Sequence, residues 1–130
     1  MYKIEKTDYG FCLAFVGFIS KEEISAWRKE SEMILVSMRK NFHVIVDLRF
    51  VKNLSVESKK IITEAQSLYR KHGMVRSSVI FDSKITAMQF RKIARESGIF
   101  ESERYIDVDS AADWKERAVE WVVNQKEPNI

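Results

Sequence analysis

The first nineteen positions show the apolar and polar pattern of two successive strands. Tyr2–Thr7 alternates with period two, as a half-exposed strand does. Phe11–Ile19 carries apolar residues at both odd and even positions, which indicates a strand buried on both faces. Asp8, Tyr9 and Gly10, which lie between these two segments, form a turn signal. The pattern therefore predicts a hairpin with two antiparallel strands at the start of the chain.

Beyond the hairpin, apolar stripes of helical period alternate with short runs that favour strands. The predicted strands are Val44–Val46, Val75–Phe81 and Glu103–Val108. The predicted helix starts are Ser20, where Glu23 completes a capping box, Ser55 or Asn53, Ser83, and the segment Ser110–Asp113. Gly73 and Gly98 stand where the second and third of these helices are expected to end.

The predicted elements follow the order β-β-α-β-α-β-α-β-α. Because strands and helices alternate after the hairpin, we expect an α/β fold with right-handed crossovers. The sheet should be mixed and mostly parallel, with five strands and four helices. The 130 residues suit one domain. We assign that domain to residues 1–125 and expect residues 126–130 to be a loose C-terminal tail.

Composition narrows the function classes. The chain has 22 Lys and Arg against 19 Asp and Glu, a net charge of +3, so it is neither a basic nucleic-acid tail nor an acidic disordered segment. The single cysteine, Cys12, excludes a disulfide within the chain. No apolar run approaches the roughly 20 residues of a membrane-spanning helix. We expect a cytoplasmic protein with no transmembrane segment and no nucleic-acid partner.

Motifs for catalysis or cofactor binding are missing from the sequence. The four glycines are isolated, so no Gly-rich loop is present to hold a nucleotide phosphate. No G-x-S-x-G presents a nucleophilic serine. His43 and His72 lack the spacing of metal ligands. The sequence therefore predicts a protein that is not an enzyme, with no catalytic residue and no cofactor.

Three aspartates provide an alternative interpretation. Asp47, Asp82 and Asp107 each fall at or near the C-terminal end of a predicted strand, where open α/β sheets place their ligand sites. Carboxylate oxygens at that edge would suit Mg²⁺. Aspartates after strands also serve as ordinary turn and capping residues. The interpretation as turn and capping residues is favoured here, and a metal-dependent enzyme is the third hypothesis for function.

Three segments together resemble the SpoIIAA-like branch of the STAS superfamily, over nearly the whole chain. The first is Val16–Glu23, which is similar to the family's entry into its first helix. The second is Val44–Leu48, before a loop and a helix. The third is Arg104–Asp109, followed by a helix with Ala118 and Trp121. The resemblance implies a small, non-enzymatic regulatory or interaction module that binds a protein partner or associates with itself.

Regulatory members of the family phosphorylate a serine at the start of the helix after the central strand. The matching stretch here is Asn53–Ser58, which lacks the family's Asp-Ser pair. Ser55 and Ser58 are the candidate positions for such regulation. Phosphate at a helix N-terminus would be electrostatically favourable.

Uncharacterised bacterial members of this branch are often noted as similar to lipid-binding CRAL-TRIO domains. This resemblance implies a second hypothesis, a carrier or sensor of a lipid or another apolar small molecule. The residues that could line its pocket or an interface are Met74, Met88, Phe90, Phe100 and Trp121, with Met33, Met38 and Ile99 as further candidates. Methionine adapts well to apolar ligands, although it also fills ordinary cores.

Overall fold

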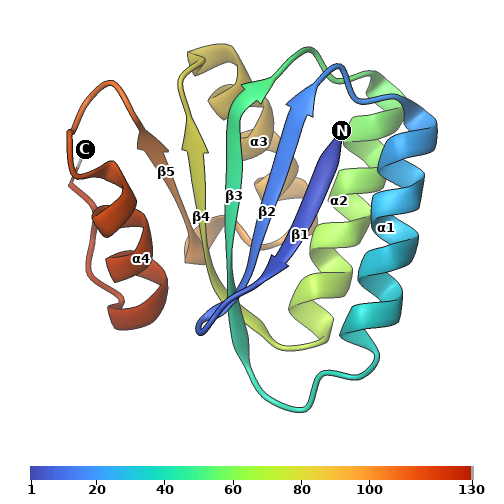
Figure 1. Cartoon of the computed structure of the whole chain (residues 1–130), viewed down its shortest axis with the longest axis horizontal. Helices are drawn as coiled ribbons and strands as arrows, with labels where there is room; N and C mark the ends of the chain where they lie inside the picture. The colour runs from blue at the N-terminus through green and yellow to red at the C-terminus, as the bar shows by residue number, and fades with distance from the viewer. Residues whose placement is uncertain (130) are drawn as a thin grey trace.

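A five-stranded sheet runs through the centre of the computed structural model, which describes residues 1–129 (Figure 1). The strands are β1 (Tyr2–Lys6), β2 (Gly10–Gly17), β3 (Phe42–Val51), β4 (Met74–Phe81) and β5 (Glu103–Asp107). The helices are α1 (Lys21–Leu35), α2 (Val56–Lys71), α3 (Lys84–Ser97) and α4 (Trp114–Asn124), with a 3-10 turn, η1, at Phe100–Ser102. The spatial order β1-β2-β3-β4-β5 follows the chain, with β1 antiparallel to β2 and every other pair parallel. The predicted fold class is confirmed.

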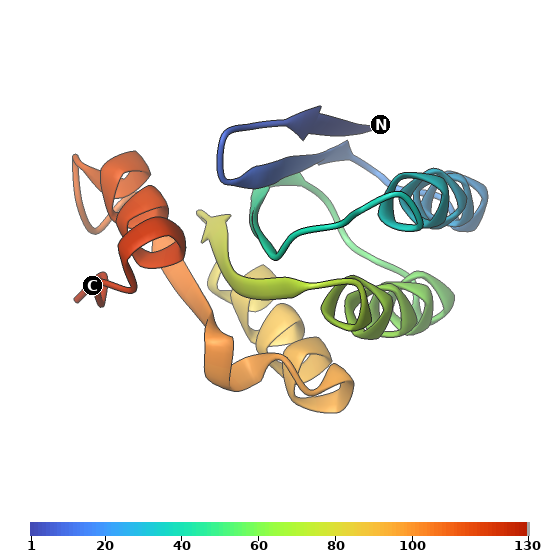
Figure 2. The same ribbon diagram turned by 90° about the horizontal axis from the view of Figure 1, so that it is seen from below.

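The helices cover the two faces of the sheet unequally. Helices α1, α2 and α3 lie on one face, and α4 packs on the other against β3, β4 and β5 (Figure 2). Alternate residues of a strand serve the two layers: Val44 belongs to the larger core and Ile45 to the smaller core beneath α4. The strands buried on both faces therefore read as continuous apolar runs.

Serine caps begin the first three helices. The hydroxyl oxygens of Ser20, Ser55 and Ser83 each accept a hydrogen bond from the backbone N–H three residues later, at 3.1, 3.1 and 3.4 Å. These bonds satisfy amides that a helix start leaves without a partner. Only half of the predicted capping box is formed at Ser20, because the Glu23 carboxylate pairs with the amino terminus of Met1 at 2.7 Å.

Gly10 makes the close approach between β2 and β3 possible. It has φ +146°, and a Cβ atom at this position would lie 2.1 Å from the backbone oxygen of His43. No other residue can occupy the position without displacing the ladder. The hairpin turn predicted from Asp8, Tyr9 and Gly10 therefore also sets the parallel pairing that follows it.

The element boundaries that differ from the predicted ones include the end of β3 and the start of α4. β3 continues to Val51 because Val16 and Gly17 of β2 offer pairing partners to Phe50 and Val51. α4 starts at Trp114, three residues after Ala111, where its predicted apolar stripe begins. Asp113 occupies its N-cap position without a side-chain capping bond and pairs instead with Arg117 at 2.8 Å.

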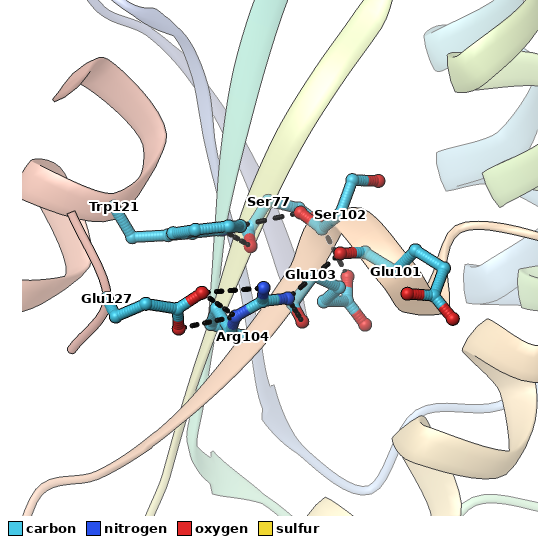
Figure 3. A network of polar contacts seen from close by, with 7 residues as sticks. All are labelled: Ser77, Glu101, Ser102, Glu103, Arg104, Trp121 and Glu127. Atoms are coloured by element: carbon cyan, nitrogen blue, oxygen red, sulfur yellow. Dashed lines mark hydrogen bonds and ion pairs between the residues drawn. The ribbon is translucent and has the colours of Figure 1, made fainter. Parts of the chain in front are cut away.

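Residues 126–129 also differ from the loose tail that the sequence predicts. The Arg104 guanidinium lies 3.9 Å from the centre of the Trp121 ring and pairs with the Glu127 carboxylate at 2.8 Å (Figure 3). Arg117 donates a hydrogen bond to the carbonyl of Pro128, which is buried. The chain is thus held against α4 and β5 through Pro128, and Ile130 lies outside the described residues.

Candidate functional site

The carboxyl ends of β2, β3, β4 and β5 meet at one edge of the sheet, at the top of Figure 1. The chain leaves this edge four times, to enter α1, α2, α3 and α4, and the three serine-capped helix starts lie there together. Open α/β sheets place their binding sites at this edge. Exposed apolar groups at this carboxyl edge are therefore candidates for a binding surface.

Five large apolar side chains at the carboxyl edge are exposed to solvent by 58% to 77%. They are Phe18 before α1, Phe50 near the end of β3, Val56 at the start of α2, and Ile85 and Met88 in the first turns of α3. We call these five residues the edge patch. Single exposed apolar residues are ordinary, but several at one edge indicate an interaction surface.

Backbone pairing places two members of the edge patch, Phe18 and Phe50, near each other. Gly17 pairs with Val51, and the Lys52 N–H donates to the Gly17 carbonyl at 2.9 Å, which places Phe18 beside the end of β3. Val56 shares a groove of about 400 Å³ with α3, whose floor includes Ile93. The rim of this groove carries Lys59, Lys60 and Lys92 against Glu64 and Glu96. The edge patch thus continues onto the α2–α3 surface.

Arg49 links the edge patch to α4. Its guanidinium lies 4.9 Å from the centre of the Phe50 ring and 4.8 Å from that of Trp114. Asp47 fixes it from below, accepting hydrogen bonds from Arg49 Nε at 3.0 Å and from Nη2 at 2.9 Å. The hydrogen bond to Asp47 raises the pKa of Arg49, which burial would lower. Phe50 therefore stacks on a guanidinium group that Asp47 holds in place.

The three candidate metal ligands are not brought into one site. Asp47 lies in the middle of β3, because that strand is longer than predicted, and its carboxylate is occupied by Arg49. Asp107 ends β5 and accepts a hydrogen bond from the N–H of Asp109 at 2.9 Å, as a turn residue does. Asp82 follows β4 and is exposed. Residues 1–129 contain no group of three His, Cys, Asp or Glu side chains placed to hold a metal ion.

The two candidate regulatory serines lie at the carboxyl edge, at the start of α2. Ser55 is the N-cap and is partly exposed, whereas Ser58 is fully buried. The Ser55 hydroxyl donates to Ser58 Oγ at 3.0 Å while accepting from the Ser58 N–H. A modifying enzyme could reach Ser55 in the folded chain, but Ser58 only after α2 opens.

Three of the candidate pocket residues, Met74, Phe90 and Ile99, line one small cavity, and the other candidates do not line it. This cavity inside the larger core has a volume of about 30 Å³, far below the roughly 300–1,000 Å³ of small-molecule sites. Met88 is exposed on α3, and Phe100 lies on η1 beneath the guanidinium of Arg95. Trp121 is buried in the smaller core, where its indole N–H donates to the carbonyl of Ser77 at 3.0 Å.

Sequence reasoning singled out Met88 of the edge patch and missed the other four residues. Their signal was present: Phe18, Val56 and Ile85 are apolar residues close to helix starts, and Phe50 lies near a strand end. All four are outside the stripes that form the core. Recognising them requires knowledge of which loops share an edge, which pairing of the strands decides.

The comparisons with known proteins bear on the fold. No protein-family model matches the chain, and no curated protein matches it either. The crystal structure of an uncharacterised protein of the DUF3478 family from Shewanella loihica PV-4, described as having a SpoIIAA-like fold, is similar to it. The two are 19% identical, with a TM-score of 0.57, over 88% of this chain and 91% of the other. The chain has a SpoIIAA-like fold, as the resemblance implied. None of the helices within residues 1–129 is long and apolar enough to span a membrane.

Proposed function

We propose that this protein is a non-enzymatic interaction module that binds a protein partner through the edge patch. The observation that carries the proposal is the gathering of five exposed apolar side chains at the carboxyl edge. Burying such side chains against a partner removes apolar surface from water, at about 25 cal/mol per Å². The free chain gains nothing from keeping them exposed, so their arrangement favours a bound state.

The surroundings of the edge patch suit an interface. Two of its members are phenylalanines, and Arg49 and Trp114 lie beside Phe50. Aromatic residues and arginine dominate the binding energy of protein interfaces. Three helix starts, each fixed by a serine cap, hold the loops at this edge, so a partner would meet an ordered surface.

The other two hypotheses have less support. A lipid carrier needs a pocket that the 30 Å³ cavity does not provide in this conformation. A metal-dependent enzyme needs carboxylates that converge, and Asp47 is already paired with Arg49. A protein-binding module requires only the exposed surface that is present.

Capture from cells that produce the protein tests the proposal. A double variant, Phe50→Ser with Met88→Ser, removes two members of the edge patch. The matched control is Met33→Ser with Val36→Ser, which changes two side chains that are exposed by 69% and 67% on α1 and just after it. Tagged protein in each form is isolated after crosslinking, and its bound proteins are quantified by mass spectrometry.

We expect at least one protein that is captured by the unaltered chain and the control and lost from the edge variant. Sedimentation of the purified chain shows whether that protein is a second copy of the chain itself. Equal capture by the edge variant and the control would contradict the proposal.

A further inference from the structure

A carboxyl group lies inside the larger core, and the edge patch does not use it. Glu103 is the first residue of β5 and is 3% exposed. The Ser77 hydroxyl donates to its Oε2 at 2.6 Å, and the Tyr105 hydroxyl donates to its Oε1 at 2.7 Å. Figure 3 shows Glu103 beside Ser77, at the base of β5. Neither partner carries a positive charge, so nothing neutralises an ionised Glu103.

The charged and titratable groups around Glu103 are directed elsewhere. Arg91 and Arg95 of α3 lie over the rings of Tyr105 and Phe100, at 4.6 and 4.3 Å from the ring centres. Tyr69 of α2 bonds to Ser31 of α1, and Arg70 of α2 donates to the Gly98 carbonyl. Glu101 belongs to η1, and Arg104 turns toward Glu127. No ion pair within residues 1–129 includes Glu103.

Burial raises the pKa of Glu103 to about 7, and the hydrogen bonds from Ser77 and Tyr105 oppose that rise. The direction follows from desolvation, since a carboxylate in an apolar core loses the hydration that stabilises its charge. A protonated carboxyl group avoids this cost and gains an O–H donor.

The small cavity in the core adjoins the same carboxyl group. Its lining includes Glu103, Tyr69 and Trp27 among apolar residues. Trp27 Nε1 is buried without a hydrogen-bond partner, and it is the one such side-chain nitrogen or oxygen within residues 1–129. An unpaired buried donor costs about 1–3 kcal/mol. The cavity volume of about 30 Å³ exceeds the roughly 10–15 Å³ that one water molecule needs.

We propose that this cavity is a binding site for a single water molecule, which accepts the indole N–H of Trp27 and is hydrogen-bonded to a Glu103 that carries its proton. The water satisfies the one orphan donor, and the proton removes the one uncompensated charge from the core. Folding then takes up a proton from solvent at pH values between 4.5 and about 7, because the unfolded chain leaves Glu103 ionised there.

Unfolding in urea at pH 5 and pH 8, compared between the unaltered chain and Glu103→Gln, tests the proton. Between the ordinary pKa of 4.5 and the raised value of about 7, the folded chain binds a proton that the unfolded chain lacks. Stability from this group is therefore fully present at low pH and is lost as pH rises through about 7. The unfolding constant of the unaltered chain should rise about 70-fold more than that of the variant across this interval.

Equal pH dependence of the two proteins would overturn the proton assignment. Carbon-13 NMR of the Glu103 carboxyl group in the unaltered chain gives its titration without any variant, so the answer does not depend on Glu103→Gln folding. A titration midpoint of Glu103 near 4.5 would also overturn the proton assignment.

Water contacts of the indole protons in NMR test the ligand. We expect a cross-peak from a long-lived water to the Trp27 indole proton, with a chemical shift that follows the Glu103 titration. The matched control is Trp121, whose equally buried indole N–H already donates to Ser77 and should show no such cross-peak. A Trp27 indole proton without water contact would mean that the cavity is dry and would overturn the water site.

Discussion

Gly10 is the residue at which one added methyl group should do most damage. A Cβ there would lie 2.1 Å from the His43 carbonyl oxygen, inside the β2–β3 ladder. We expect Gly10→Ala to lower the free energy of unfolding by more than about 3 kcal/mol, beyond the roughly 0.5–3 kcal/mol of most single substitutions. Urea unfolding measures the change.

Gly17→Ala is the matched control for Gly10→Ala. Gly17 also has a positive φ, +73°, but a Cβ there would meet nothing within 4 Å. Its cost should be only the left-handed backbone penalty of about 1 kcal/mol. Similar losses for the two variants would show that the contact with His43 does not limit the position.

Ser55 provides a second residue-scale prediction. Its hydroxyl caps α2 by accepting from the Ser58 N–H at 3.1 Å. Ser55→Ala should lower the free energy of unfolding by about 1 kcal/mol. Ser55→Asp should retain most of the stability, because aspartate also caps helices and its negative charge is attracted to the positive end of the helix dipole. Urea unfolding of the two variants measures both values. An alanine variant as stable as the unaltered chain would contradict the capping role.

Residues whose roles are local were predictable, and residues whose roles depend on distant partners were not. Ser20 and Ser83 were identified because a cap bonds to an amide three residues away in the same chain. The burial of the Glu103 carboxyl group could not be predicted from the strand pattern. It depends on Ser77, 26 residues away, and on the helices that cover this face of the sheet. The orphan donor of Trp27 likewise exists only after α1 has packed on the sheet.

Arg104 links the end of the chain, from α4 to Pro128, to β5. This side chain joins β5 to α4 through Trp121 and to the following segment through Glu127 (Figure 3). The hydrogen bond from Arg104 lowers the pKa of Glu127 below its usual range. The ion pair is therefore present at neutral pH and is lost as pH falls through that lowered pKa.

Glu127→Gln should loosen this end of the molecule alone. We expect faster hydrogen exchange in the last turn of α4 and in β5, with β1 to β3 unchanged, because the substitution removes the negative partner of Arg104. Glu120→Gln is the control, since Glu120 lies on α4 and bonds to the neighbouring Asn124. Equal exchange in all three proteins would contradict the role of Glu127.

At the scale of elements, the stripes and strand runs predicted every helix and strand, and the boundaries failed where pairing overrides local pattern. β3 continues through Arg49 and Phe50 because β2 lies beside it. That extension moved Asp47 from the predicted strand end to the strand centre. Residues 126–129 looked loose because they are mostly polar, and a contact with Arg104, 23 residues earlier, was not visible in that composition.

At the scale of the whole molecule, the SpoIIAA-like fold brings the loops before α1, α2, α3 and α4 to one edge and leaves apolar side chains there without cover. The element order was sufficient to predict this fold. It was not sufficient to predict the edge patch, because the patch is formed by residues that are separated by up to 70 positions and share only their place in space.

Photo-crosslinking in living cells tests whether a partner binds at the edge patch. A photoreactive phenylalanine analogue is placed at Phe50, and in a second protein at Met33 on the outer face of α1. We expect a crosslinked protein of defined mass from position 50 and none from position 33. Crosslinks of equal yield at both positions, or only at Met33, would contradict binding at the edge patch.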